Sequence, residues 1–151
     1  MQKYYKEVPV LLDFEEVDKY KVIEKSGELL KESGFVEDRY IDSMKTIYDE
    51  SGPYIVISKG IAMPHARPED GALKCGFSII RLKNGVEFGN QDNDPVKIVI
   101  GLSAKSDSDH LKTIQIISNI LDGNEKVLLE GTEDEIRKII KSAEEDVWNR
   151  F

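Results

Sequence analysis

Cysteine and histidine are scarce in this chain of 151 residues, and their scarcity excludes several kinds of chemistry. The single cysteine, Cys75, has no partner for an internal disulfide and belongs to no thiolate cluster that could hold zinc. It lies in a predicted strand, so we expect it to be packed and unreactive. The two histidines, His65 and His110, do not form an HxxxH pair, which weakens the case for a zinc site further.

Long apolar runs and blocks of basic residues are also missing. No stretch approaches the roughly 20 apolar residues that a helix needs to cross a bilayer, and the opening MQKYYKEVPV lacks the apolar centre of a signal peptide. The net charge of −8 is spread along the chain and opposes the binding of nucleic acid or anionic lipid. We expect a cytoplasmic protein with no direct membrane insertion, in which any anionic ligand needs local positive groups.

Hydrophobic patterning predicts helices and strands in the order of an α/β domain. The predicted helices span 16–33, 37–50, 106–121, 125–129 and 132–141, and the predicted strands span 54–57, 75–82, 86–88 and 95–103. The run at 95–103 is apolar in its middle, which is typical of a central strand that is buried on both faces. We therefore predict one domain over residues 1–151, a three-layer α/β/α sandwich with a mixed β-sheet of about five strands flanked by helices. Residues 1–14 are expected to form a short N-terminal extension.

Each long helix carries an apolar stripe at helical spacing, which should face the core. A glycine at the end of the first helix, Gly34, is expected to cap it. The residues expected to point inward include Val17, Tyr20, Ile23, Leu29 and Leu30 in the first helix, Tyr40, Ile41, Met44, Ile47 and Tyr48 in the second, and Leu111, Ile114, Ile117 and Leu121 in the helix at 106–121.

The segment GIAMPHARPEDG, residues 60–71, places His65 in a conformationally restricted loop. Pro64 fixes its own φ and pushes Met63 towards an extended conformation, while Gly60 lets the backbone approach another group closely. Such a loop indicates that the ring is held still for a purpose. Near neutral pH a useful fraction of imidazole is uncharged, and a neutral ring nitrogen can act as nucleophile, acid–base group or metal ligand. The alternative is a histidine that only caps a loop carbonyl.

His110 lies in the first turn of the most clearly predicted helix, directly after the central strand. Ser106 and Asp109 have the spacing of a capping box, with Asp in place of the usual Glu. Free N–H groups at a helix N-terminus favour an anion and keep His110 neutral until the anion arrives. Ligands of open α/β sheets gather outside the carboxyl ends of the strands, where His110 is expected. The alternative is an exposed first-turn residue without a function.

Arg67 supplies a permanent positive charge two residues after His65. Its guanidinium fits phosphate oxygens better than a lysine does, although a surface ion pair with Glu69 or Asp70 explains it equally well. A phosphoryl group on His65 would carry close to two negative charges, and each unit pair at about 4 Å contributes roughly 4 kcal/mol at an effective dielectric of 20. We predict one anion site, in which His65 accepts a phosphoryl group and His110 stabilises the phosphate. The expected phosphate-binding residues are Arg67, Ser103, Ser106 and Asp109.

A metal site is the competing interpretation of the two histidines. Asp107 or Asp109 could join them, but zinc needs three or four ligands at suitable spacing and Arg67 would repel the cation. The acidic cluster at 92–94 lacks the spacing of a calcium loop and is expected to be a turn. We therefore expect no metal site.

These motifs resemble a known family, the enzyme IIA component of the bacterial phosphoenolpyruvate-dependent sugar phosphotransferase system (PTS), of the mannitol–fructose type (EIIA type 2). Its members carry a loop that ends in Pro-His, here GIAMPH, and a second histidine after the central strand, here in SDSDHLK. The resemblance extends from about residue 15 to residue 141. The strings GPYIVISKGIAMPHARPEDG, CGFSIIRL and QDNDPVKIVIGLSA resemble the ascorbate-type branch, which shows the HxRPE pattern present at 65–69. Mannitol-type members usually have an arginine near the end of the second helix, where MKTIYDESGPY has none.

The resemblance implies a phosphotransferase. His65 would accept a phosphoryl group from the phosphohistidine of the carrier protein HPr, as a tele-phosphohistidine, and pass it to a cysteine of an enzyme IIB protein that feeds the IIC permease. The family implies no metal or organic cofactor, and the branch implies ascorbate as the transported compound. Two alternatives stay open: a stand-alone regulatory module that senses phosphorylation, and a IIA component for another sugar or a pentitol. The oligomeric state also stays open, including a homodimer.

Overall fold

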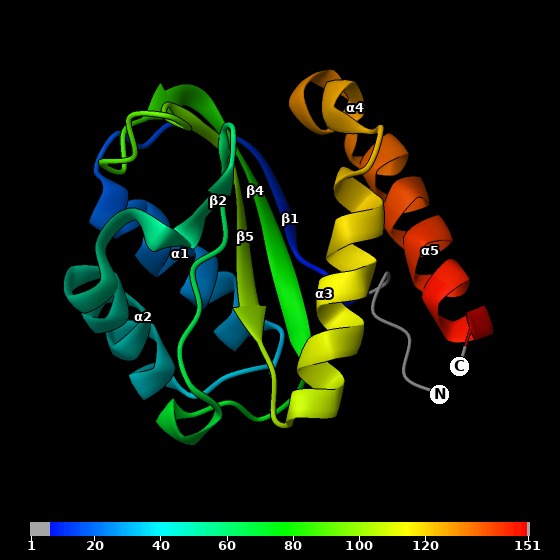
Figure 1. The fold of residues 1–151 in the computed structure, drawn as a ribbon, viewed down its shortest axis with the longest axis horizontal. Coiled ribbons are helices and arrows are strands. Elements are labelled where there is room, and N and C mark those ends of the chain that lie inside the picture. Colours follow the sequence, from blue (N-terminus) through cyan, green and yellow to red (C-terminus); the bar gives the residue numbers. More distant parts are fainter. Residues whose placement is uncertain (1–6, 151) are drawn as a thin grey trace.

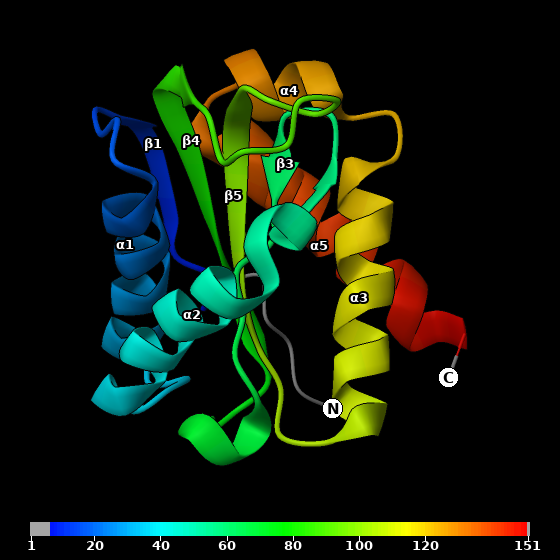
Figure 2. The ribbon, with the colours of Figure 1, turned by 60° about the vertical axis from the view of Figure 1, so that its left-hand side comes forward.

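A mixed β-sheet lies between two layers of helices in the computed structural model, which describes residues 7–150 (Figure 1). The elements in chain order are β1 (Val10–Phe14), α1 (Lys19–Glu32), α2 (Asp38–Ser51), η1 (Gly52–Ile55), β2 (Val56–Ser58), β3 (Ile61–Ala62), η2 (Pro68–Asp70), β4 (Gly76–Val86), β5 (Val96–Ser103), α3 (Asp107–Leu121), α4 (Glu125–Glu130) and α5 (Glu133–Arg150). Among these residues the helices α1 and α2 cover one face of the sheet, and α3 and α5 cover the other (Figure 2). The predicted three-layer architecture is confirmed.

The described residues form a five-stranded sheet in the order β1-β4-β5-β3-β2. The pairs β1–β4 and β3–β5 are parallel, and the pairs β4–β5 and β2–β3 are antiparallel, so the sheet is mixed as predicted. The apolar strand β5 occupies the middle position, with a burial pattern that leaves only Lys97 partly exposed. Burial on both faces explains why its sequence does not alternate.

Two hydrophobic clusters pack on the opposite faces of the sheet. The cluster beneath α1 and α2 includes Ile23, Tyr40 and Val99, and the cluster beneath α3 to α5 includes Ile100 and Ile117. Adjacent residues Val99 and Ile100 therefore serve different cores, as the alternation of side chains along a strand requires. Within residues 7–150, none of the helices combines the length and the apolar composition needed to span a bilayer.

The expectation that residues 1–14 form an extension is wrong for residues 10–14. They make β1, an edge strand whose Val10 and Leu11 pair in parallel with Ile79 and Ile80 of β4. The first six residues lie outside the described part of the chain. The N-terminal segment is thus part of the sheet, because a short apolar run gains a hydrogen-bonded neighbour and a helical cover there.

The strands around the predicted loop also differ from the prediction. The segment 54–57 begins as the 3₁₀ turn η1, because Pro53 occupies its first turn, and becomes strand only at Val56. Ile61–Ala62 forms the unpredicted strand β3, which lies between β2 and β5. The expected separate strand at 86–88 is absent from the described residues, because β4 continues to Val86.

Helix boundaries account for the remaining differences. The first helix begins at Lys19 rather than residue 16, with Asp18 as N-cap, so Val17 lies before it and is 74% exposed. Leu111 is 56% exposed, because the buried face of α3 consists instead of Thr113, Ile116, Ile117 and Ile120. The last helix continues to Arg150, past the predicted end at 141. Gly34 has a φ of +79° after α1, as expected of a glycine that ends a helix.

Candidate active site

A small pocket lies at the end of the sheet where the parallel strands β3 and β5 reach their carboxyl ends. The loop after β3 and the connection from β5 to α3 meet at this end of the molecule, at the bottom of Figures 1 and 2. The pocket has a volume of about 240 Å³, below the range of about 300–1,000 Å³ that is usual for small-molecule sites. Its polar side chains come from Tyr40, His65, Arg67, Ser106, Asp107 and His110.

His65 is held on both its backbone and its ring. It forms a single parallel bridge with Leu102 of β5, whose N–H donates to the carbonyl of Pro64 over 3.0 Å. The ring nitrogen Nδ1 lies 2.9 Å from the carbonyl oxygen of Met63. A carbonyl oxygen can only accept, so Nδ1 carries the proton and the lone pair of the neutral ring is on Nε2. The described residues form no hydrogen bond to Nε2, which leaves that nitrogen available for chemistry.

His110 reaches the same pocket from the first turn of α3. Ser106 caps this helix, since its side chain accepts a hydrogen bond from the N–H of Asp109 over 3.2 Å. The predicted N-cap is confirmed, and the N–H of His110 donates to the carbonyl of Ser106 as the first helical hydrogen bond. His110 is exposed, so its ring can meet a group that arrives from solvent. The helix N-terminus adds partial positive charge beside it.

Arg67 lines the pocket with an exposed side chain. The surface ion pair with Glu69 or Asp70 is not found within residues 7–150. The carboxylate of Asp70 instead accepts a hydrogen bond from the backbone N–H of Arg67 over 3.0 Å. The guanidinium is therefore not committed to a neighbouring acid and can meet an anion in the pocket.

The structure does not bring Ser103 or Asp109 to the lining of this pocket. The buried hydroxyl of Ser103 donates to the carbonyl of Lys74 over 2.9 Å, so it joins the segment just before β4 to the end of β5 and is not directed at a phosphate. Asp109 contributes its backbone N–H to the cap of α3 and its carbonyl to Cys75. Cys75 is buried and contacts Thr113, as expected of a packed residue.

Tyr40 is the residue of this site that the sequence did not reveal. Its spacing in α2 predicted a core residue, and the ring is indeed buried. The hydroxyl, however, accepts a hydrogen bond from the N–H of Ala66 over 3.0 Å and donates to the carbonyl of Leu102 over 2.7 Å. These partners lie 26 and 62 residues away along the chain, so no local pattern could have indicated them.

The chemistry of the pocket favours an anion over a metal ion. Arg67 and the N-terminus of α3 provide positive potential, which the acid Asp107 only partly offsets. Across residues 7–150, histidine, cysteine and carboxylate side chains form no group of three or more that could hold a metal ion. The arrangement thus presents a nucleophilic ring nitrogen, a cation and a second imidazole around one small space.

The family model described as "Phosphoenolpyruvate-dependent sugar phosphotransferase system, EIIA 2" matches residues 4–143. This chain belongs to the EIIA type-2 family. The family resemblance seen in the sequence is therefore confirmed, and so is the assignment as an enzyme, because the EIIA components of this system are phosphotransferases.

Two curated relatives of this EIIA domain carry different substrate names. The mannitol-specific cryptic phosphotransferase enzyme IIA component of Escherichia coli K12 is 34% identical over 143 residues, which cover 93% of this chain and 97% of the relative. The ascorbate-specific EIIA component of Shigella boydii serotype 4 is 39% identical over 99 residues, which cover 65% of this chain and 64% of the relative.

Solved structures confirm the fold of the EIIA domain. The solution structure of the mannitol-specific cryptic enzyme IIA CmtB from E. coli superimposes with a TM-score of 0.78 at 35% identity, over 90% of this chain and 93% of that one. The mannitol enzyme IIA of E. coli, in its complex with phosphorylated enzyme IIB, superimposes with a TM-score of 0.76 at 27% identity, over 88% and 94% of the two chains.

Proposed function

We propose that His65 is the phosphoryl acceptor of this EIIA domain and that it works in the cytoplasm between phospho-HPr and an enzyme IIB protein. The observation that carries the proposal is the hydrogen bond from Nδ1 of His65 to the carbonyl of Met63. It leaves the lone pair on Nε2, beside Arg67 and His110 in one pocket. The ring is thus held in the tautomer that a tele-phosphohistidine requires.

The proposed reaction consists of two displacements at phosphorus. The lone pair of His65 Nε2 forms a new N–P bond to the phosphoryl group of phospho-HPr, and the old N–P bond breaks with its electron pair returning to the HPr imidazole. A thiolate of enzyme IIB then attacks the same phosphorus, and the electron pair of the His65–P bond returns to Nε2. Each step asks the protein mainly for positioning and charge stabilisation, and no cofactor enters.

The surrounding groups suit this transfer. A phosphoryl group on Nε2 would meet the guanidinium of Arg67, the imidazole of His110 and the N-terminal N–H groups of α3, whose cap is Ser106. These groups offset the net charge of −8 of the whole chain. An enzyme IIB protein as acceptor is supported by the structural relative that was solved in complex with phosphorylated IIB. The IIB protein would in turn serve the IIC permease.

The test of this proposal is to map the phosphorylated atom. Incubation with phosphoenolpyruvate, enzyme I and HPr should add one acid-labile phosphate to the chain. In ¹⁵N-labelled protein, coupling between ³¹P and ¹⁵N should identify Nε2 of His65 as the bonded atom. Phosphate on Nδ1, on His110 or on no residue would contradict the proposal.

For the transported compound we propose ascorbate. The support is the HxRPE pattern at residues 65–69 and the 39% identity with an ascorbate-specific relative, although that match spans 99 residues against 143 for the mannitol-specific one. The phosphorylated chain should pass its phosphate faster to an ascorbate-type IIB protein than to a mannitol-type one. Faster transfer to the mannitol-type IIB protein would contradict ascorbate as the substrate. Transfer to neither IIB protein would favour the stand-alone regulatory module.

Replacement of His110 by alanine is expected to slow phosphoryl transfer about 100-fold, the usual effect of removing a positioned proton donor or hydrogen-bond donor. Alanine suits a helix, and His110 is exposed, so the fold should persist. The measurement is the single-turnover rate with phospho-HPr. Ser108→Ala, in the same turn of α3 but outside the pocket lining, is the matched control. Equal rates in the two variants would remove His110 from the mechanism.

Replacement of Arg67 by alanine is expected to shorten the lifetime of the phosphohistidine about fivefold, since an exposed charge pair contributes on the order of 1 kcal/mol. The measurement is the decay of the ³¹P signal at neutral pH in low salt. Lys59→Ala removes the same charge from an exposed residue outside the pocket and controls for the overall field. If both variants lose phosphate at the same rate, Arg67 acts only through net charge.

A further inference from the structure

The backbone of the His65 loop is joined to β5 through a side chain. In a parallel bridge, the N–H and C=O of one residue bond to the two peptide groups that flank its partner. The first bond is direct, from the N–H of Leu102 to the carbonyl of Pro64. The second passes through Tyr40: the N–H of Ala66 donates to its hydroxyl, and the hydroxyl donates to the carbonyl of Leu102. The tyrosine hydroxyl thus stands where the second backbone hydrogen bond of the bridge would be.

This hydroxyl is well suited to hold a backbone in place. The Tyr40 side chain is only 1% exposed and belongs to the cluster between α2 and the sheet, so its ring cannot move without disturbing the core. The oxygen also lies 3.2 Å from the carbonyl of Ala66, which places it against both polar groups of that residue. Burial raises the pKa of Tyr40 to about 12, so the hydroxyl keeps its proton and donates throughout the neutral range.

We propose that Tyr40 is a positioning residue for phosphoryl transfer, which fixes the His65 peptide to the end of β5 through its hydroxyl. The proposal rests on the proposed role of His65 as acceptor. His65 lies between two anchors, the carbonyl of Pro64 bound by Leu102 and the N–H of Ala66 bound by Tyr40. Without the second anchor, the His65 residue is bound to β5 on one side only. Displacement of a reacting atom by about 1 Å can cost on the order of 100-fold in rate.

Tyr40→Phe removes the hydroxyl and keeps the ring, so it tests the proposal directly. Tyr48→Phe is the matched control, because Tyr48 lies on the same helix, is equally buried and donates its hydroxyl to the carbonyl of Phe88, away from the His65 loop. The readout is single-turnover phosphorylation at increasing concentrations of phospho-HPr. For Tyr40→Phe we expect a maximal rate about 10- to 100-fold lower with little change in the half-saturating concentration. Tyr48→Phe should transfer at the rate of the parent.

A lower maximal rate with an unchanged half-saturating concentration indicates a loss of positioning in a folded protein. A Tyr40→Phe protein that is folded and transfers as fast as Tyr48→Phe would overturn the proposal. The parent chain supplies a second test that needs no variant: the amide proton of Ala66 should exchange slowly with solvent, and rapid exchange would show that the hydroxyl bridge does not persist. Failure of the parent to be phosphorylated on His65 would instead refute the proposed function. Because the parent is measured beside each variant, the two proposals can be told apart.

Discussion

His65→Ala is expected to reduce phosphate incorporation from phospho-HPr to background, a loss of at least about 10³-fold, because removal of a nucleophile leaves no bond-forming atom. The pocket lining includes one other imidazole, that of His110, but that ring belongs to an exposed helical turn. Within the described residues no hydrogen bond to a backbone carbonyl fixes the tautomer of His110, whereas Met63 fixes that of His65. The measurement is the stoichiometry of acid-labile phosphate after incubation with phosphoenolpyruvate, enzyme I and HPr.

The His65→Ala protein should remain folded, because the imidazole is only half-buried and its hydrogen bond goes to a neighbouring loop carbonyl. The backbone anchors at Pro64 and Ala66 do not involve the ring. A melting temperature close to that of the parent would therefore accompany the loss of activity. A chain without His65 that still takes up one equivalent of phosphate would place the acceptor elsewhere, and His110→Ala in the same background would locate it.

The site could be anticipated from the sequence where the signal is local. The Pro-His pair and the arginine two positions later stand in one loop, and the N-cap at Ser106 is visible from spacing alone. That His65 and His110 share a pocket required a further step, the rule that ligands gather at the carboxyl ends of strands. The rule holds here because β3 and β5 are parallel neighbours that deliver both loops to one end of the sheet.

The parts of the site that could not be predicted from the sequence depend on contacts between residues that are far apart along the chain. Tyr40 is recognised as buried from its helical spacing, but its hydroxyl bonds to residues that only the tertiary structure brings near. Ser103 ends the central strand and was therefore expected to be a ligand, yet its hydroxyl donates to the carbonyl of Lys74. Side-chain direction at a strand end depends on register, which the neighbouring strand sets.

The fold was predicted where apolar runs are long and was missed where they are short. β5 is recognised by its long apolar run and the long helices by their periodicity, whereas β2 and β3 contain three and two residues. Alternation cannot be read over so few positions. β1 is interrupted by Asp13, whose φ of +55° breaks the register between Leu11 and Phe14. Its strand pairing is therefore a consequence of the sheet rather than of its own sequence.

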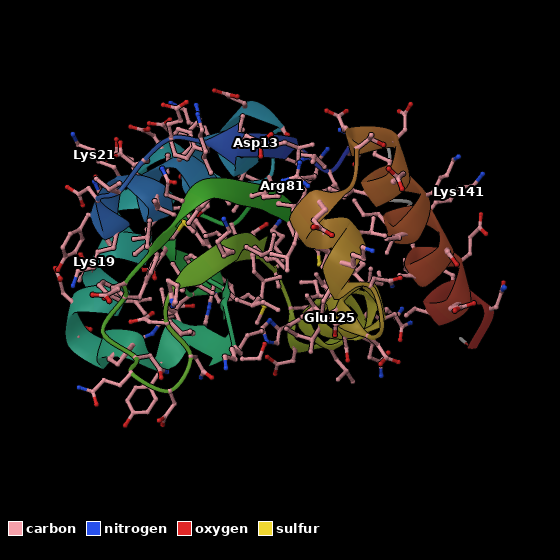
Figure 3. All side chains as sticks on the ribbon, turned by 90° about the horizontal axis from the view of Figure 1, so that it is seen from above. Asp13, Lys19, Lys21, Arg81, Glu125 and Lys141 are labelled. Carbon is pink, nitrogen blue, oxygen red and sulfur yellow. The ribbon has the colours of Figure 1, made fainter. Side chains whose placement is uncertain are left out.

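Arg81 of β4 marks another feature that only the structure reveals, at the opposite end of the molecule from the pocket. Figure 3 shows Arg81 beside α4 and close to Asp13. Its Nη1 donates to the carbonyl oxygens of Leu128 and Gly131, at 3.2 and 2.8 Å, where α4 ends. The N–H groups four residues further on, those of Thr132 and Glu135, are not available to these carbonyls. The N–H of Thr132 donates to the carboxylate of Glu135, and the N–H of Glu135 donates to the hydroxyl of Thr132. Arg81 therefore supplies the donors that the end of α4 lacks.

Arg81→Met is expected to lower the free energy of unfolding by about 3 kcal/mol, because a buried carbonyl that loses its donor costs about 1–3 kcal/mol. The buried carbonyl of Leu128 and the partly buried carbonyl of Gly131 are both affected. Methionine fills most of the space of the arginine stem, so little of the loss should come from a cavity. The pair with Asp13 adds little, since that carboxylate is largely exposed. The measurement is urea denaturation, in which the midpoint should fall while the dependence of the unfolding free energy on urea concentration stays unchanged.

Arg39→Met is the matched control for this prediction. Arg39 also bonds one carboxylate, that of Glu37, and one carbonyl, that of Glu69, but its side chain is 61% exposed. Water can replace both partners there, so the variant should lose less than about 1 kcal/mol. The two arginines differ in burial and in the number of backbone carbonyls that they bond, two for Arg81 and one for Arg39. If they prove equally costly to replace, the stabilisation by Arg81 does not come from satisfying buried carbonyls, and the end of α4 must be held by its apolar contacts to β5 instead.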